Sequence, residues 1–151
     1  MLFLGNSEHN IDPKLRLAIP AKYRNMWDPA KHGGAWVSVA WPTGQIRLFT
    51  ERSFERIVEQ AVSGQTSLMP TAEQHAMQVS ELGMAARLEM DSAGRIALPK
   101  KQIERTGLKQ EVTIVGMGSR LEIWDREAWN RKEDEVFAKA QDMADKLGRT
   151  Q

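Results

Sequence analysis

The stretch Asp12-Pro13-Lys14-Leu15-Arg16-Leu17-Ala18-Ile19-Pro20 occurs a second time as Asp91-Ser92-Ala93-Gly94-Arg95-Ile96-Ala97-Leu98-Pro99. The Asp, Arg, Ala and Pro positions are identical in register, and two further positions exchange one aliphatic residue for another. The two stretches lie 79 positions apart, about half the length of the 151-residue chain. This repeat predicts two copies of one small unit, each with an acidic–basic turn that leads into an apolar strand.

The repeat extends into two pairs of short segments with strand-like alternation. Residues 37–40 and 46–49 correspond, at an offset of 75, to residues 112–115 and 121–124. In both copies apolar and polar residues alternate, as they do in half-buried strands. The intervening residues 41–45 and 116–120 have turn-forming compositions, so each pair is predicted to be a β-hairpin.

Helices are predicted where capping residues precede apolar residues at helical spacing. Thr71 and Gln74 have the spacing of a capping box, and prolines suit the first turn of two shorter helices. Gly64 and Gly107 are expected to end two of the helices. The apolar stripe of the last helix could either complete the core or contact a neighbouring molecule. The capping residues and prolines are Thr50, Thr71, Asp125, Pro20 and Pro99.

Composition excludes several classes of protein. The chain is 41% hydrophobic and 27% charged, as in soluble globular proteins. It has no cysteine, which excludes disulfides, Cys-ligated zinc and thiol catalysis and fits a reducing cytosol. No stretch resembles a signal peptide or a membrane span, and the three histidines share no metal-ligand spacing. We therefore expect a cytoplasmic protein without a cofactor, metal site, catalytic site, small-molecule substrate or membrane partner.

Positive charge is concentrated on the two segments that carry the repeated stretch. Residues 1–50 and 86–110 each contain six Lys or Arg against three Asp or Glu, whereas residues 51–85 contain two against five. The net charge of the whole chain is only +1. The uneven distribution of charge nevertheless allows a local positive electrostatic field around the two repeated stretches. Binding of a polyanion would require such a field.

This pattern resembles the MraZ family of bacterial transcriptional regulators, which are built from two tandem AbrB/SpoVT-like domains. The resemblance extends over residues 1–147 and is most specific in the two D-x-x-x-R motifs, each followed by aliphatic–Ala–aliphatic–Pro and then by a hairpin. The segments that carry it are residues 1–5, residues 8–12, Asp12 with Arg16, Asp91 with Arg95, residues 116–124 and Trp129.

The resemblance implies a β-rich α+β fold, a duplicated swapped-hairpin β-barrel with flanking helices. It divides the chain into a first repeat with its helix (1–64), a linker and connecting helix (65–86), and a second repeat with the C-terminal helix (87–151). It also implies a ring-shaped homo-oligomer that is associated with the nucleoid. Its partner would be double-stranded DNA, at short repeated promoter elements of a division and cell-wall gene cluster.

Arg16 and Arg95 are expected to project from the edge of a rigid β unit, where a guanidinium suits guanine O6 and N7 or a phosphate. The resemblance implies that both contact DNA. Asp12 and Asp91 are expected to hold the arginines or to cap the turns through backbone N–H groups. In the alternative interpretation, each Asp–Arg pair is a purely structural ion pair. Further candidates for a basic DNA-binding surface are Lys14, Lys22, Arg24, Lys100 and Lys101.

The two copies differ at the residue before the arginine. Gly94 agrees with the family's usual glycine, whereas the first copy has Leu15, with Pro13 two residues earlier. Glycine adopts positive φ without cost, and leucine does not. The first turn is therefore expected either to be built differently or to hold a strained leucine.

Three other functions remain open from the sequence. A ring-forming interaction protein could use the Asp–Arg turns only as structural elements. An antitoxin-like DNA-binding relative would be expected to have one such domain and a disordered tail, whereas this chain has two units and a helical end. A small enzyme using carboxylates is the third possibility, although no catalytic constellation supports it.

Overall fold

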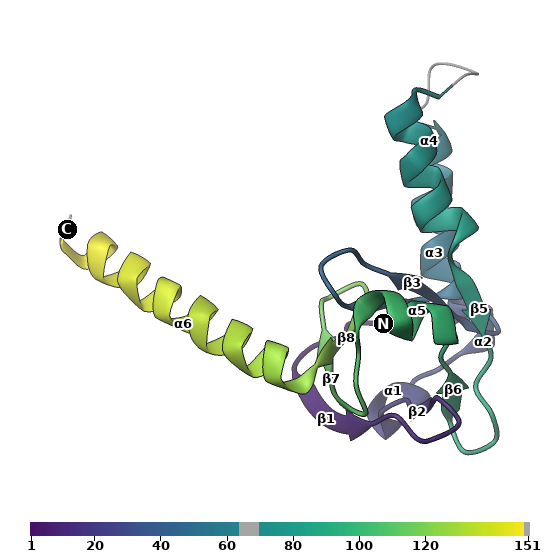
Figure 1. Ribbon diagram of the computed structural model, residues 1–151, viewed down its shortest axis with the longest axis horizontal. Helices are drawn as coiled ribbons and strands as arrows, with labels where there is room; N and C mark the ends of the chain where they lie inside the picture. The colour runs from purple at the N-terminus through teal and green to yellow at the C-terminus, as the bar shows by residue number, and fades with distance from the viewer. Residues whose placement is uncertain (64–69, 150–151) are drawn as a thin grey trace.

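The computed structural model describes residues 1–63 and 70–149, and Figure 1 shows how their helices and strands are arranged. The helix end predicted at Gly64 and the first part of the predicted linker, residues 65–69, lie outside the described residues. Strands form a central body, from which α3 and α4 project on one side and α6 projects on another (Figure 1). The predicted α+β class is confirmed.

Within the described residues, eight strands form two antiparallel sheets. The larger sheet has the order β1-β7-β8-β4-β3-β5, and the smaller is a ribbon of β2 and β6. The larger sheet ends at β1 and β5 without closing, so the expected barrel is not shown. The strands are β1 (Asn6–Asn10), β2 (Arg16–Ala18), β3 (Trp36–Ala40), β4 (Ile46–Thr50), β5 (Ala86–Leu88), β6 (Arg95–Ala97), β7 (Glu111–Gly116) and β8 (Leu121–Asp125).

The strands of the two halves are interleaved. Both predicted hairpins form, as β3–β4 and β7–β8. The first strand of each half pairs with the hairpin of the other half, β1 with β7 and β5 with β3. The hairpins join through β4 and β8, and β2 pairs with β6. Neither half therefore completes its strand pairing alone, which agrees with the small apolar area that four short strands can bury.

The predicted helix caps at Thr50, Thr71 and Asp125 and the predicted helix end at Gly107 are confirmed, whereas α2, capped by Asp28, was not predicted. Thr50 Oγ1 accepts a hydrogen bond from Ser53 N–H at 3.1 Å, Thr71 and Gln74 form the capping box, and Asp125 caps the last helix. Gly107 ends α5 with φ 71°. The helices are α1 (Ala21–Arg24), α2 (Pro29–His32), α3 (Glu51–Ser63), α4 (Ala72–Gln78), the π-helix η1 (Val79–Gly83), α5 (Lys100–Thr106) and α6 (Arg126–Arg149).

The core lies between the ribbon and the larger sheet. Leu17 and Ile96, one from each copy of the repeated stretch, are fully buried, and so are Leu48 and Ile123 on the two hairpins. An aromatic cluster around Trp36 completes the core beside the first hairpin. Complete burial of a leucine or isoleucine contributes about 1.5–3 kcal/mol, so both copies stabilise one shared core.

The last helix does not complete this core. Residues 130–149 of α6 are exposed, including Val136 and Phe137 on its apolar stripe. Figure 1 shows α6 extending away from the sheet along most of its length. The sequence leaves two roles open for this stripe, core packing or contact with a neighbouring molecule. Beyond Trp129, the stripe does not pack into the core of this chain.

Candidate nucleic-acid interface

The first copy of the repeated stretch forms a hydrogen-bonded turn that holds its arginine. Asp12 Oδ1 accepts hydrogen bonds from the backbone N–H groups of Lys14 at 2.9 Å and Arg16 at 2.8 Å. Asp12 Oδ2 accepts from Arg16 Nε at 2.7 Å. The backbone N–H of Arg16 chiefly lowers the pKa of Asp12, and the guanidinium lowers it further. The carboxylate thus caps the turn and orients the arginine at once.

The second copy repeats this arrangement bond for bond. Asp91 Oδ1 accepts from the backbone N–H groups of Ala93 and Arg95, each at 2.9 Å, and Oδ2 accepts from Arg95 Nε at 2.9 Å. The pKa of Asp91 is also lowered, first by the Arg95 backbone N–H and then by its side chain. Both aspartates are therefore ionised at neutral pH, and each holds one arginine.

The difference between Leu15 and Gly94 does not change the turn. Leu15 has φ 62° and Gly94 has φ 76°, so both adopt the left-handed region. The carbonyl of each residue also accepts a corresponding bond from the other half, Leu98 N–H at 2.8 Å and Ile19 N–H at 2.9 Å. The first turn is therefore built like the second, and Leu15 holds the strain, about 1–2 kcal/mol for a residue with a Cβ.

The residues around the two turns explain why one turn has leucine and the other has glycine. Leu15 packs on the core and lines an apolar pocket with Ile103 and Leu108, which recovers apolar burial against the strain. At the equivalent place in the other half, the position of Ile103 is taken by Arg24. A Cβ on Gly94 would collide with the Arg24 side chain. A side chain at position 94 would therefore have to displace Arg24 in addition to bearing the strain of a positive φ.

Arg24 has a structural task that the sequence did not reveal. Its Nε donates to the carbonyl of Ile19 at 2.8 Å, and Nη1 donates to the carbonyl of Ala93 at 3.4 Å. It therefore joins the end of β2 to the turn of the second half. Of the predicted basic residues, Arg24 is the one most engaged in holding the two copies together.

Pairing of β2 with β6 brings Arg16 and Arg95 onto one face. Arg16 lies opposite Ala97, and Ala18 lies opposite Arg95. Because side chains alternate along a strand, these four residues share the outer face, and buried Leu17 and Ile96 lie on the inner face. The arginines are diagonal neighbours, with Cα atoms about 7–8 Å apart. Only alanine side chains lie beside them on the ribbon.

The two guanidiniums are held without being enclosed. The exposed fraction of the side chain is 32% for Arg16 and 35% for Arg95. Each uses Nε toward its aspartate, and within residues 1–63 and 70–149 neither Nη atom of either arginine makes a hydrogen bond. Each arginine thus offers two outward N–H-bearing nitrogens from a fixed position, as bidentate recognition of a base or phosphate needs.

The four lysines predicted to bind DNA lie outside β2 and β6, in the segments next to them. Lys14 is exposed within the first turn. Lys22 donates to the carbonyl of Leu4 at 3.3 Å, and Lys100 lies 3.9 Å from Glu104. Lys101 is exposed next to it on α5. Because β2 and β6 are antiparallel, the segments that follow them, with Lys22 and with the Lys100–Lys101 pair, leave opposite ends of the ribbon.

A second ionic arrangement, not predicted from the sequence, joins the two hairpins. Glu122 is buried, with Arg120 at 2.8 Å and Arg47 at 3.6 Å, and it accepts from Trp124 Nε1 at 3.0 Å. Arg47 also lies over the ring of Trp41, 3.5 Å from its centroid. The alternation of apolar and polar residues predicted each hairpin, but no local sequence pattern indicated the ion pairs between the two hairpins.

Two further features were searched for in the same described ranges. Histidine, aspartate and glutamate side chains there form no group of three that could hold a metal ion. None of the helices in those ranges is both long and apolar enough to cross a membrane.

The structure thus defines a duplicated α+β protein that presents two aspartate-held arginines on one outer ribbon. Comparison with known proteins shows which family of such proteins the chain resembles. The family model for the MraZ protein, described as antitoxin-like, matches residues 82–150. A relative from Chromobacterium violaceum, named "Transcriptional regulator MraZ", is 38% identical, with 95% of each chain covered. Relatives of the same name from Nitrosomonas eutropha (36% identical, 91% of this chain and 90% of the relative) and Photorhabdus laumondii (32%, 97% and 94%) agree.

The chain belongs to the MraZ family. The D-x-x-x-R repeats and the ending around Trp129 therefore identified the family correctly from the sequence. These relatives are named as transcriptional regulators.

Proposed function

We propose that this protein is a DNA-binding transcriptional regulator and that Arg16 and Arg95 are its central DNA contacts. The relatives' shared name supports regulation of transcription. The observation that carries the site is the register of β2 and β6, which sets both arginines on the outer face of one ribbon. The alternative is that both pairs are purely structural. It would not require both arginine side chains to stay about one third exposed, with Nη atoms that make no hydrogen bond to the described residues.

The geometry suits a double-stranded target. The diagonal spacing of about 7–8 Å corresponds to roughly two base-pair rises along the axis of a duplex. A guanidinium whose Nε is already bonded keeps both Nη groups for guanine O6 and N7 or for two phosphate oxygens. Because Asp12 and Asp91 hold the arginines in place, little side-chain entropy is lost on binding. Lys14, Lys22, Lys100 and Lys101 would add phosphate contacts around this centre.

We further propose that the protein acts as a ring-shaped homo-oligomer, as the family resemblance of the sequence implies. A single ribbon with two arginines makes few contacts and would bind weakly at physiological salt. Several ribbons on one assembly, each meeting one repeat of a promoter element, would raise the affinity through effective concentration. The exposed apolar residues of α6, such as Val136 and Phe137, support such an assembly. Its target would be repeated elements ahead of division and cell-wall genes, in the nucleoid.

The test is binding of the full chain to a fluorescent duplex from upstream of its own gene, at several salt concentrations. We expect log affinity to fall linearly with log salt, and the double variant Arg16→Ala/Arg95→Ala to lose measurable binding. Arg105→Ala, an exposed arginine of α5 outside both turns, is the matched control and should bind like the wild type. Unchanged binding by the double variant would overturn the site assignment. A wild type that assembles but never binds duplex would instead favour the interaction protein.

A further inference from the structure

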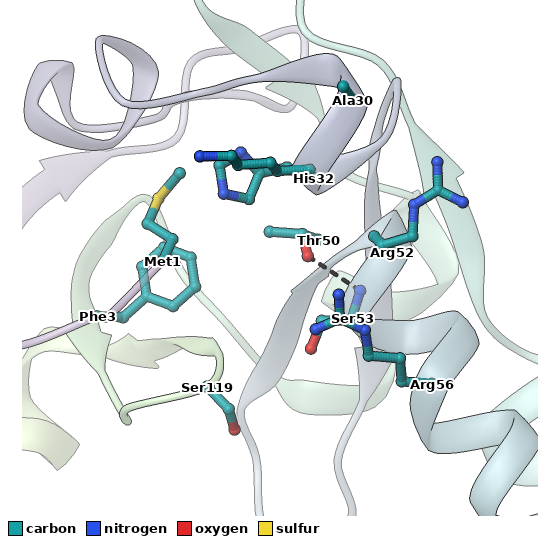
Figure 2. A pocket seen from close by; sticks show the side chains of 10 residues that line it. Met1, Phe3, Ala30, His32, Thr50, Arg52, Ser53, Arg56 and Ser119 are labelled. Carbon is teal, nitrogen blue, oxygen red and sulfur yellow. Dashed lines mark hydrogen bonds between the residues drawn. The ribbon is translucent and has the colours of Figure 1, made fainter.

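A sizeable cavity of the described chain lies outside both Asp–Arg turns. It is a pocket of about 540 Å³ between the N-terminal segment, α2, the start of α3 and the tip of the β7–β8 hairpin. Figure 2 shows His32 of α2 on one side and Ser53 and Arg56 of α3 on the other. No residue of either repeated stretch lines it, so any ligand here would be separate from the ribbon.

Positive charge in this pocket has no acidic counterpart. Lys31, Arg52 and Arg56 line it, and none of its ten lining residues is Asp or Glu. In the described ranges, Lys31 and Arg56 form no ion pair. Arg52 lies 3.1 Å from Glu55, but both side chains are nearly half exposed, and such pairs contribute little.

Other arginines of this chain do have carboxylate partners. Arg87 pairs with both Glu51 and Glu89, and Arg126 lies near Glu8 and Glu111. Three cations therefore gather around this one cavity, and two of them, Lys31 and Arg56, form no ion pair with the described residues. Such a cavity concentrates anions, because low-dielectric walls focus the field of the charges that line them.

Hydrogen-bond donors complete the lining. His32 Nδ1 accepts from the backbone N–H of Asp28 at 2.9 Å, so the ring proton is on Nε2 and this nitrogen is a donor. Burial lowers the pKa of His32, and the nearby positive amino terminus lowers it further, so the ring is a neutral donor. Ser53 and Ser119 also line the pocket. The N-terminal turn of α3 adds the partial positive charge of its helix dipole.

We propose that this pocket binds a phosphate-bearing anion. Arg52, Arg56 and Lys31 would neutralise the phosphate, and the serine hydroxyls would accompany them as donors. Arginine forks match phosphate oxygens in pairs, and lysine acts as a point charge. The phosphate would come from a free phosphorylated small molecule or from the backbone of bound DNA. This site does not depend on the DNA contacts proposed for the ribbon, because it shares no residue with them.

The experiment uses inorganic pyrophosphate as the small-molecule probe and calorimetric titration of the full chain. We expect saturable binding to the wild type and at least about a tenfold loss in Arg52→Gln/Arg56→Gln, which removes two charge-assisted contacts. The control is Arg131→Gln, an exposed arginine at the equivalent place on α6, 75 positions later, which should bind like the wild type. The Arg16→Ala/Arg95→Ala variant should also keep its pyrophosphate binding. If this variant did not bind pyrophosphate, the anion would bind at the arginines of the β2–β6 ribbon, and the proposal would be wrong.

A second measurement distinguishes the two sources of phosphate. Affinity for the duplex is compared between the wild type and Arg52→Gln/Arg56→Gln, with circular dichroism to verify the fold. Pyrophosphate binding that is lost in the variant supports a free ligand. A weaker duplex affinity with no pyrophosphate binding supports the DNA backbone. If the wild type binds no pyrophosphate and the variant binds duplex normally, the pocket takes no phosphate. A change only in the mass of the assembly would mean that another copy covers the pocket, and the proposal would be wrong.

Discussion

The turns at residues 12–16 and 91–95 make the same hydrogen bonds with different residues inside them. In the second turn, glycine at the left-handed position leaves space for the Arg24 side chain, which joins the two halves. In the first turn, Leu15 adopts the same conformation and fills an apolar pocket beside Ile103. The aspartate–arginine arrangement is thus kept, while its support differs between hydrogen bonds from an arginine and an apolar contact. What the two copies share is the part we propose to be functional, and what differs is packing.

The largest effect should come from the arginines taken one at a time. We expect Arg16→Ala and Arg95→Ala each to weaken duplex binding by about tenfold to a hundredfold, the range for losing one good bidentate contact. Because the two turns are equivalent, the two losses should be similar. Fluorescence anisotropy at one fixed salt concentration measures both. A loss for one arginine and none for the other would show that the symmetry of the turns does not extend to DNA.

The next effect tests the support of the second turn. Gly94→Leu places a Cβ at positive φ and against Arg24, so we expect the free energy of unfolding to fall by about 2–4 kcal/mol. Adding Arg24→Ala should recover part of this loss, since it removes the collision but not the strain. Urea denaturation of the single and double variants gives the comparison. No recovery in the double variant would mean that Arg24 is not the obstacle.

Acid unfolding compares the two carboxylates. The pKa of Asp12 and of Asp91 is lower in the folded protein than the ordinary value of 3.8. Their ionised forms therefore stabilise the fold fully above pH 3.8, and this contribution disappears as the pH falls through the lowered values. Asp12→Asn and Asp91→Asn should each show a shallower loss of stability on acidification than the wild type. Thermal melts at a series of acidic pH values check this, and parallel curves would contradict it.

The smallest effect is expected for Leu15→Gly. Glycine would release the backbone strain of about 1–2 kcal/mol but would lose the apolar burial of the leucine, of similar size. We therefore expect the stability to change by less than about 1 kcal/mol, in contrast with the reverse exchange at Gly94. Urea denaturation measures it. A large loss would mean that packing by Leu15 far exceeds the strain that it carries.

Much of the fold followed from the sequence because repetition and alternation are local signals. The duplicated stretch, both hairpins and the caps at Thr50, Thr71 and Asp125 were predicted and are present. The conformation of the turn around Leu15 could not be predicted. The identity of one residue does not reveal the apolar pocket whose contacts compensate the strain of its positive φ. Closure of the sheet was expected from the family resemblance alone, and the strand pairing does not show it.

The site was predicted less completely, since its supports are distant in the chain. The sequence indicated the aspartate–arginine pairs, which lie four residues apart. It could not show that Arg24 reaches a turn 69 residues away, a contact made only by tertiary packing. The basic pocket was also missed, because Lys31 and Arg56 belong to different helices and follow no common spacing.

A structure of the protein bound to a duplex from its own promoter tests the central claim most directly. The account predicts that Nη atoms of both Arg16 and Arg95 lie within about 3 Å of base or phosphate acceptors. It also predicts that each Nε remains bonded to its aspartate. A complex in which the β2–β6 ribbon faces away from the DNA, with both arginines still on their aspartates alone, would contradict it.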